Sequence, residues 1–248
     1  MTAYVVAADP VHENAVNYFS AALGLYRLGY FVERYDLANL PGFEIDGDTP
    51  VFGGIESIHA VLPAYSGLPY YPQELSEHLF RSIEERAIGD VQAGEFFKPL
   101  EQDHKLFSPR VLDDSFESEL LISRIPPETT VLTSPAVDFD SEFRVYVLNG
   151  EVLDICRYKG DPMKFPATDA IREMVTKCSH YAAAFGLDVG VTSDGHTAVV
   201  ELNDFCCLGN YGLRATDYAR CIVARWSEVW SQFSLGSQQT EQGEADNA

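Results

Sequence analysis

One stretch near the C-terminal end constrains the fold of this chain more than any other: residues 186–213, GLDVGVTSDGHTAVVELNDFCCLGNYGL. Asp194-Gly195 lies between two runs rich in β-branched residues. This dipeptide readily takes the positive φ angles of a two-residue hairpin turn. The pattern therefore predicts a β-hairpin in which Ser193 pairs with His196.

The register of this hairpin predicts a cluster of oxygen-bearing side chains. Counting back from the turn places Asp188 opposite Glu201, and directly opposed side chains share a face of the sheet. Asn203, two residues after Glu201, lies on the same face. The other face is expected to be core, and it carries Val189, Val191, Ala198, Val200 and Leu202.

Two carboxylates placed opposite each other repel, so a positive charge is expected between Asp188 and Glu201. Carboxylate and amide oxygens suit a hard cation such as Mg²⁺, which is often bound together with nucleotide phosphates. The alternative is that Asp188 caps the strand end and Glu201 is simply solvated. The apolar opposite face and the third oxygen donor, Asn203, keep the metal site as an equal candidate.

The composition excludes some classes of partner. The chain of 248 residues is 46% hydrophobic, which is typical of a globular protein with a real core, and its formal net charge is −21. Because nucleic-acid backbones are bound by clustered Lys and Arg, this charge argues against a nucleic-acid partner. No apolar run approaches the roughly 18 residues of a membrane span, so no membrane partner is expected.

The cysteine pattern predicts a cytoplasmic location. The five cysteines are odd in number and fall in expected strands and helices or in the adjacent pair Cys206-Cys207, which is typical of reduced thiols rather than a disulfide framework. The adjacent pair is also a weaker candidate for a redox or soft-metal site.

The first half of the chain predicts a small parallel α/β layer. Strands are expected at 3–8 and 30–35, with a helix that begins at Asp9-Pro10 between them, and a strand–helix–strand unit of this length forms a parallel pair. A short helix through Ile55 and Leu62 follows. A third strand near 66–71 and a helix from Pro72 to Ile88 complete the expected layer.

The middle of the chain carries two candidate phosphate-binding lysines. Lys98 ends a short aromatic strand, FFKP, and Lys105 follows seven residues later. An ammonium held against a low-dielectric wall contacts phosphate strongly, although two lysines at this spacing are also common surface residues. Apolar residues from Leu120 to Arg124 are expected to form a strand closed by two prolines, and 129–134 is expected to form another.

A second hairpin is expected around Asn149-Gly150, the strongest turn signal in the chain. Its register opposes Glu142 to Arg157, as a cross-strand ion pair, and Arg144 to Ile155. With no acid directly opposite, the Arg144 guanidinium is expected to be available for an anion, and Arg is well suited to a bidentate contact with phosphate.

The C-terminal region predicts two helices and a tail. Apolar residues recur at helical spacing over 169–185 and over 216–233. Residues 234–248 are rich in Ser, Gln, Gly and Glu and lack apolar periodicity, so they are expected to be disordered.

Taken together, the lysine–proline strand, the EFRVYV strand before the Asn-Gly turn, and DVGV…VVELND before a glycine-bearing loop resemble the ATP-grasp superfamily. The closer resemblance is to a divergent clade named for one arginine and two lysines, which includes a eukaryotic cell-division-cycle assembly chaperone and bacterial and phage relatives. The resemblance spans about 96–213. It implies an α/β (α+β) protein in which a small parallel α/β layer precedes a two-lobed nucleotide-binding unit with antiparallel sheets.

The resemblance also implies a division of the chain and a role for each part. The expected parts are an N-terminal α/β domain (1–92), a small nucleotide-covering subdomain (93–135), a C-terminal subdomain with the metal site (136–233) and the tail (234–248). The implied site residues bind ATP through Lys98, Lys105, Glu142 and Arg144, read adenine through the backbone of Leu121, Ile122, Ser123 and Arg124, and hold Mg²⁺ through Asp188, Glu201 and Asn203.

The activity implied by the resemblance is that of an ATP- and Mg²⁺-dependent carboxylate–amine ligase. Such an enzyme phosphorylates a carboxylate and lets an amine displace the phosphate from the acyl phosphate, with Lys98 and Arg144 as catalytic residues. For the clade in question the expected substrate is a protein or peptide. The first alternative is a non-catalytic ATP-binding chaperone or partner-binding module, and the second is a metal-dependent phosphohydrolase built on Asp188 and Glu201.

Overall fold

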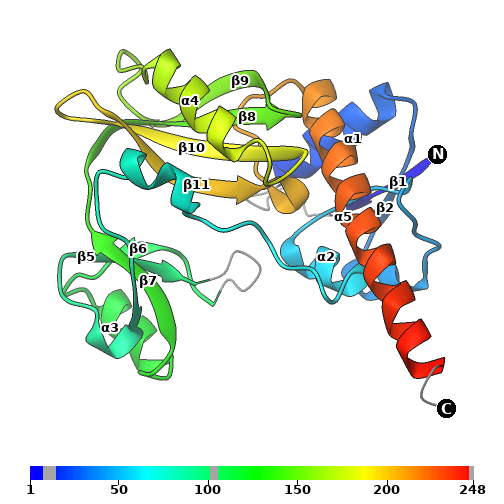
Figure 1. Cartoon of the computed structure of the whole chain (residues 1–248), viewed down its shortest axis with the longest axis horizontal. Helices are drawn as coiled ribbons and strands as arrows, with labels where there is room; N and C mark the ends of the chain where they lie inside the picture. Colours follow the sequence, from blue (N-terminus) through cyan, green and yellow to red (C-terminus); the bar gives the residue numbers. More distant parts are fainter. Residues whose placement is uncertain (8–14, 101–105, 246–248) are drawn as a thin grey trace.

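The N-terminal part of the protein is a parallel layer. The structure, a computed structural model, describes residues 1–7, 15–100 and 106–245, with side chains up to residue 232. Strands β1 (Thr2–Val6), β2 (Phe31–Tyr35) and β3 (Val51–Phe52) form a sheet in the order β2-β1-β3, with both pairs parallel. Helices α1 (Ala15–Arg27) and α2 (Ile55–Val61) accompany it, and a 3₁₀ turn, η1 (Leu37–Gly42), follows β2 (Figure 1). The predicted parallel pairing of the strands at 3–8 and 30–35 is confirmed. The third strand of the layer is Val51–Phe52, which was not predicted, and the expected helix start at Asp9-Pro10 lies outside the described residues.

A second, antiparallel sheet with its own core follows. It contains β4 (Glu84–Ala87), β5 (Glu95–Pro99), β6 (Arg110–Val111) and β7 (Thr130–Pro135) in the order β4-β7-β5-β6, and α3 (Phe116–Ser123) packs beside it. Phe97, Val131 and Ile88 are buried at the centre of this unit, and Leu121 and Ile122 of α3 pack against them. Residues 88–90 form a single 3₁₀ turn, η3 (Ile88–Asp90).

The third sheet is the largest and is also antiparallel. It contains β8 (Phe139–Leu148), β9 (Glu151–Gly160), β10 (Ala184–Thr192) and β11 (Thr197–Asp204) in the order β11-β10-β8-β9. Helix α4 (Thr168–Cys178) covers one face, where its Ile171, Met174 and Val175 bury Val145 and Leu187. The 3₁₀ turn η2 (Gln73–His78) packs against the same side, and η4 (Phe205–Cys207) ends β11.

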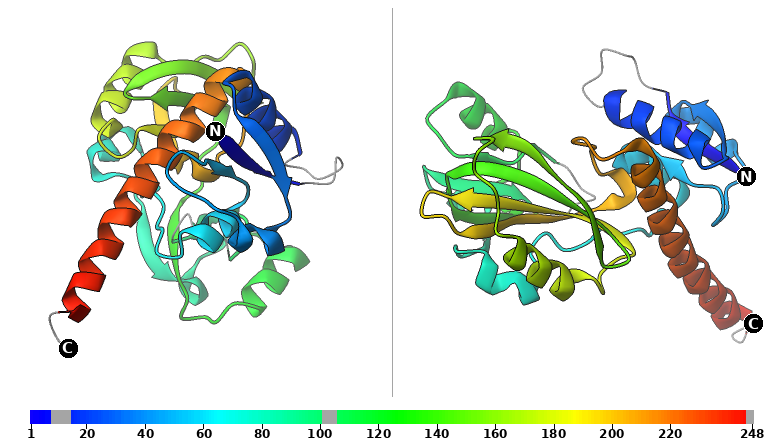
Figure 2. Two further views of the ribbon diagram at one scale, coloured as in Figure 1. Left: turned by 90° about the vertical axis from the view of Figure 1, so that its right-hand side faces the viewer. Right: turned by 90° about the horizontal axis from the view of Figure 1, so that it is seen from above.

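A long C-terminal helix joins the third sheet to the parallel layer. Helix α5 (Ala215–Ala245) runs beside α1, and its last turns project from the rest of the molecule (Figure 2). The two helices approach closely at Gly24, where an added Cβ would clash with the Ala215 carbonyl oxygen. Only glycine fits at this crossing, since the neighbouring atom is backbone. Tyr218 of α5 lies in one core with Val5 of β1 and Tyr146 of β8.

Two predicted elements between the first and second sheets are wrong. Residues 66–71 form no strand, and only Gln73–His78 of the expected helix 72–88 is helical, as a 3₁₀ turn. Prolines at 63, 69 and 72 cannot donate ladder hydrogen bonds, so this segment is an extended connector. Beyond it, Glu84–Ala87 pairs with β7 as strand β4, which places this part of the chain in the second sheet.

The predicted ends of the two C-terminal helices are also wrong. Helix α4 ends at Cys178, and Ala184 already pairs with Leu148 in the sheet. In contrast, α5 continues through Ala245, where a disordered tail was expected after 233. The tail lacks apolar periodicity but contains Gln, Glu and Ala, and adding residues to an existing helix is much easier than nucleating one.

The mixed α/β class with one parallel and two antiparallel sheets is confirmed. The division at 92, 135 and 233 stays a prediction. Within the described ranges, none of the helices combines the length and apolar character needed to span a bilayer.

Candidate functional site

One face of the third sheet is apolar and the opposite face carries charged side chains. Phe143, Val145, Leu187 and Val189 point toward α4 and belong to the core. Because side chains alternate along a strand, the residues between them point to the other face. That face gathers Glu142 and Arg144 from β8, Asp188 from β10, and Glu201 and Asn203 from β11.

The predicted pairing of Asp188 with Glu201 is confirmed, but the predicted register of the residues nearer the turn is wrong. The hairpin turn spans Thr192 to His196, where the Thr192 amide donates to the His196 carbonyl at 3.0 Å, and Val191 lies opposite Thr197. A β-bulge between Asp188 and Val189 then restores the register. Such a bulge adds one residue to one strand, here Val200, so Val199 rather than Val200 joins the core.

Arg144 is fully engaged by Asp188. Its Nε and Nη2 atoms each donate to a different Asp188 oxygen at 2.7 Å, and both side chains are buried, with 6% and 2% of their surface exposed. Arg144 Nη1 donates to the Gly209 carbonyl at 3.1 Å. The prediction that the Arg144 guanidinium is available for an anion is therefore wrong. The reason is that β8 has a neighbouring strand on each side. Arg144 lies opposite Cys156 on β9 and opposite Asp188 on β10.

Lys98 reaches Glu201 from a different sheet. Its side chain on β5 is 1% exposed, and its ammonium donates to Glu201 Oε2 on β11. The ammonium also lies 3.1 Å from the centre of the Tyr70 ring. Lys98 is therefore neither a surface residue nor an unpaired one. The positive charge expected between Asp188 and Glu201 is supplied from either side by Arg144 and Lys98.

The pKa shifts follow from this burial and pairing. Burial lowers the pKa of Lys98, although Glu201 opposes the shift. Burial alone would raise the pKa of Glu201, but Lys98 brings it below its usual value. Burial raises the pKa of Asp188 to about 6 even though Arg144 lowers it, and the Glu201 and Glu142 charges add to the rise. At neutral pH, both carboxylates are therefore ionised and paired with cations.

Asn203 completes the cluster of oxygen donors. Its Nδ2 atom donates to Asp188 Oδ2 at 3.2 Å, and the same side chain hydrogen-bonds Glu201. Asp188, Glu201 and Asn203 are thus brought together as the hairpin predicted. A set of two carboxylates and one amide has the chemistry of a Mg²⁺ site. Two cations, the Lys98 ammonium and the Arg144 guanidinium, and the neutral Asn203 amide now donate to the two carboxylates.

Glu142 lies at the edge of the same face, but not with the predicted partner. It accepts hydrogen bonds from Lys159 Nζ at 2.5 Å and from the Tyr158 hydroxyl at 2.9 Å. Bulges in the β8–β9 pair shift the register, so Glu142 lies opposite Lys159 and not Arg157. The Asn149-Gly150 turn itself is confirmed, with both residues at positive φ.

A loop that the sequence analysis did not single out covers the charged face. The Tyr211 ring lies 4.6 Å from the Arg144 guanidinium carbon and stacks on Tyr158. The loop is held by Tyr146, whose hydroxyl donates to the Gly209 carbonyl at 3.1 Å and accepts from the Tyr211 amide at 2.7 Å. In the sequence, the signal for this loop is the aromatic residue within the Gly-Asn-Tyr-Gly segment (209–212) that follows β11.

The remaining predicted site residues fall into two groups. Lys105 lies outside the described residues. Leu121, Ile122, Ser123 and Arg124 were expected to form an extended hinge, but 121–123 form the end of helix α3 and Arg124 is its C-cap. Ser115 caps the start of this helix by accepting from the Ser118 amide at 3.2 Å. The carbonyls of Leu121 and Ile122 are bonded within the helix end, so an adenine-reading hinge has no basis here.

Comparison with known proteins adds the evidence of relationship. A family model matches residues 78–221, which is more than half of the chain and includes every described residue of the cluster. It is described as an ATP-grasp domain, family 2 of the clade named for one arginine and two lysines. No curated protein sequence matches the chain.

Solved structures match the whole architecture. A D-alanine–D-alanine ligase from Bacillus anthracis aligns with a TM-score of 0.55 and 13% identity over 98% of this chain and 99% of that one. An N5-carboxyaminoimidazole ribonucleotide synthetase aligns with a TM-score of 0.59 and 11% identity over 90% and 76%. A D-cycloserine synthetase aligns with a TM-score of 0.55 and 13% identity over 90% and 99%. At these identities the matches show a shared fold.

Proposed function

We propose that this chain, which belongs to the ATP-grasp family and has the ATP-grasp fold, is an ATP- and Mg²⁺-dependent carboxylate–amine ligase. One observation carries the proposal. Lys98 from the second sheet and Arg144 from the third converge on the oxygen donors of β10 and β11. Two cations that face two carboxylates across two sheets suit a triphosphate with its metal. The phosphates can bind the two cations, and the metal can bind the two carboxylates.

The donor set fits Mg²⁺. The oxygens of Asp188, Glu201 and Asn203 would hold it, as these hard ligands suit a hard cation. Asp188 and Glu201 are each now in contact with a positively charged group, which marks the places where a cation is favourable. When bound, Mg²⁺ would neutralise charge on the phosphates.

The chain's own residues would then act by changing partners. Lys98 would leave Glu201 for a phosphate oxygen, so Glu201 becomes available to the metal. Arg144 would stay tied to Asp188 through Nε and Nη2, and its Nη1 group would turn from the Gly209 carbonyl to a phosphate oxygen. Tyr70 beside Lys98 and Tyr211 over Arg144 would exclude water from both cations, which strengthens their contacts with phosphate.

The proposed reaction has two steps. A substrate carboxylate oxygen attacks the γ-phosphorus of ATP, and ADP leaves with the bond electrons. An amine nitrogen then attacks the acyl carbon, loses a proton and displaces phosphate, so the product is an amide. Lys98 and Arg144 would stabilise the transferred phosphoryl group, a task of positioning and charge that needs no nucleophilic side chain. The resemblance to the arginine–lysine clade supports a protein or peptide as the substrate.

The test begins with nucleotide binding. Asn203→Ala removes one oxygen donor and leaves both buried ion pairs intact, so it should weaken the binding of Mg²⁺ with a non-hydrolysable ATP analogue by at least about tenfold in calorimetry. Asn39→Ala, at an exposed position in the parallel layer, is the matched control. Equal affinities of the two variants would rule out the proposed metal site.

Turnover then separates the ligase from a binding module. ADP release from Mg·ATP should rise when peptides with free carboxylates are supplied together with amines. Tight Mg·ATP binding with no ADP release across such a panel would assign the chain to the ATP-binding module instead. ADP release that needs no amine, with water as the acceptor, would point to a phosphohydrolase.

A further inference from the structure

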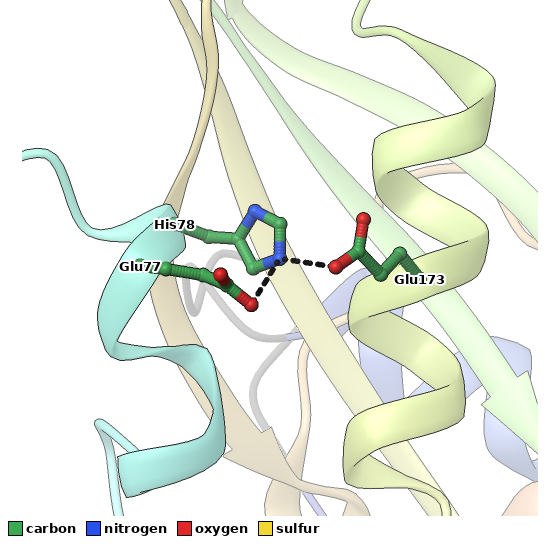
Figure 3. Close-up of side chains that lie close together, drawn as sticks. All are labelled: Glu77, His78 and Glu173. Carbon is green, nitrogen blue, oxygen red and sulfur yellow. Dashed lines mark ion pairs between the residues drawn. The ribbon is translucent and has the colours of Figure 1, made fainter.

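A second cluster of metal-ligating side chains lies on the far side of the third sheet from the charged face. Glu77 and His78 come from the 3₁₀ turn η2, and Glu173 comes from α4, which packs against it. Figure 3 shows the His78 ring between the two carboxylates. One ligand atom from each residue lies within 4.8 Å of the others. The sheet and its apolar core separate this cluster from Lys98 and Arg144.

The His78 ring points a buried, unpartnered nitrogen into this cluster. Only 9% of His78 is exposed, and its Nε2 atom has no hydrogen-bond partner. The atom lies 3.5 Å from Glu173 Oε1 and 3.8 Å from Glu77 Oε1. A buried polar atom without a partner is rare and unfavourable, so its orientation toward two carboxylates calls for a ligand between them.

The two carboxylates already share one cation. Lys177, one turn after Glu173 on α4, contacts Glu77 Oε1 and lies 2.9 Å from Glu173 Oε1. Among the described contacts, its ammonium reaches the two carboxylates and leaves His78 Nε2 without a hydrogen-bond partner. Lys177 is on a flexible stem with 28% of its side chain exposed, so it can move into solvent when another cation arrives.

We propose that Glu77, His78 and Glu173 form a site for a divalent transition-metal ion of the Zn²⁺ type. One imidazole nitrogen and two carboxylate oxygens are a common ligand set for Zn²⁺, and bonds of about 2.1 Å place tetrahedral ligands about 3.4 Å apart. The 3.5 and 3.8 Å separations require only small movements to reach this spacing. A fourth ligand could be water, since Glu77 and Glu173 are both exposed to solvent.

The role of the metal is to fasten η2 to α4. The chain that carries η2 continues into β4 of the second sheet, whereas α4 covers the third. A bound ion would therefore fix the start of the connection between the two sheets, with no contact to the nucleotide face. The site does not depend on the proposed ligase activity.

The first experiment compares Zn²⁺ binding by the full chain and two variants. His78→Gln removes the nitrogen ligand and should weaken the Zn²⁺ site by at least about tenfold in calorimetry. Glu74→Gln is the matched control, because Glu74 is an acid on the same turn that contacts His180 and Tyr181 instead. Its Zn²⁺ affinity should equal that of the unaltered chain. An unchanged affinity in His78→Gln would overturn the proposal.

The second experiment removes the resident cation. Lys177→Met leaves the two carboxylates without their shared ammonium, so Zn²⁺ should bind this variant more tightly than the unaltered chain. Zn²⁺ should also raise its Tm by more, because a ligand stabilises the folded state by an amount that grows as the ratio of its concentration to its Kd rises. If Lys177→Met binds Zn²⁺ no more tightly than the unaltered chain, and Zn²⁺ does not raise its Tm, the cluster is a set of ion pairs and not a metal site.

Discussion

Lys98 is a buried cation whose charge is balanced by Glu201. It is 1% exposed and its only carboxylate partner among the contacts described is Glu201. Breaking a buried ion pair by removing one partner leaves an uncompensated charge, which typically costs about 3–5 kcal/mol. A substitution of Glu201 therefore perturbs stability as well as metal binding.

We predict that Glu201→Gln lowers the free energy of unfolding by about 3 kcal/mol. The value lies at the lower end of the range because 24% of the Glu201 side chain is exposed. Lys98→Met added to this variant removes the stranded charge and should recover part of the loss. Urea unfolding followed by circular dichroism measures both effects. Glu128→Gln, at an exposed loop position, should change nothing, and a Glu201→Gln variant as stable as this control would contradict the prediction.

The residues of the charged face show what the sequence could reveal. Asp188 and Glu201 were placed on one face because they flank one hairpin, but their direct pairing also depends on the bulge at Val200, which offsets a turn that is one residue longer than predicted. Arg144 was assigned wrongly, since its partner Asp188 comes from a strand 44 residues away that lies beside β8. A hairpin turn predicts the strand on one side of β8, which is β9. The strand on its other side, β10, is far away in the sequence and depends on the whole fold.

Among the elements, α3 and the loop after β11 were the hardest to infer. The run of apolar residues in α3 is short, and periodicity cannot separate a short buried strand from a short helix. The cap at Ser115 and the acids Glu117 and Glu119 in the first turn favour the helix. The loop was missed because side chains of a distant strand, Tyr146 and Arg144 of β8, hold it in position.

We predict that Tyr146→Phe releases this loop while the sheet stays folded. The change removes a buried hydroxyl with two hydrogen bonds, so the free energy of unfolding should fall by about 1–3 kcal/mol. The Tyr211 amide loses its acceptor and should exchange its hydrogen faster in a hydrogen-exchange measurement.

Tyr158→Phe is the matched control for the loop. It keeps the ring that stacks on Tyr211 and removes only the hydrogen bond to Glu142. The Tyr211 amide should stay protected in this variant. Equal exchange rates at Tyr211 in both variants would mean that ring stacking, and not Tyr146, holds the loop in place.

At the scale of the whole molecule, the three sheets were foreseen in type but not in arrangement. Strand types follow from local patterns, whereas the order β11-β10-β8-β9 and the place of β4 depend on contacts between segments far apart in sequence. Two of these contacts join separate sheets or segments: Lys98 with Glu201, and the Leu202 amide with the Tyr70 carbonyl at 2.8 Å. The candidate site lies where these segments meet, so its full set of partners could not be read from any single motif.

Three buried cysteines can report whether the hydrophobic clusters of the molecule unfold together. Cys178, Cys221 and Cys206 each lie in a different hydrophobic cluster: under α4, between α1 and α5, and between α2 and α5 respectively. The first two clusters contain side chains from opposite faces of β8, and α5 contributes to the second and third. Shared elements of this kind couple the clusters into one cooperative unit.

We therefore predict that these three thiols become reactive together. In the native state burial raises the pKa of Cys178 and Cys221 to about 12 and also raises that of Cys206, and these three thiols are closed to solvent. A thiol reagent at pH 8 should therefore modify the half-buried Cys207 first and the half-buried Cys156 more slowly, because burial raises the pKa of Cys156 to about 11. Across a urea series, the modification of the three buried thiols, assigned by mass spectrometry, should share one midpoint. If Cys178 reacts at a urea concentration that still protects Cys221, the cluster under α4 unfolds before the cluster between α1 and α5. The two faces of the third sheet would then not form one cooperative unit, and the prediction would be wrong.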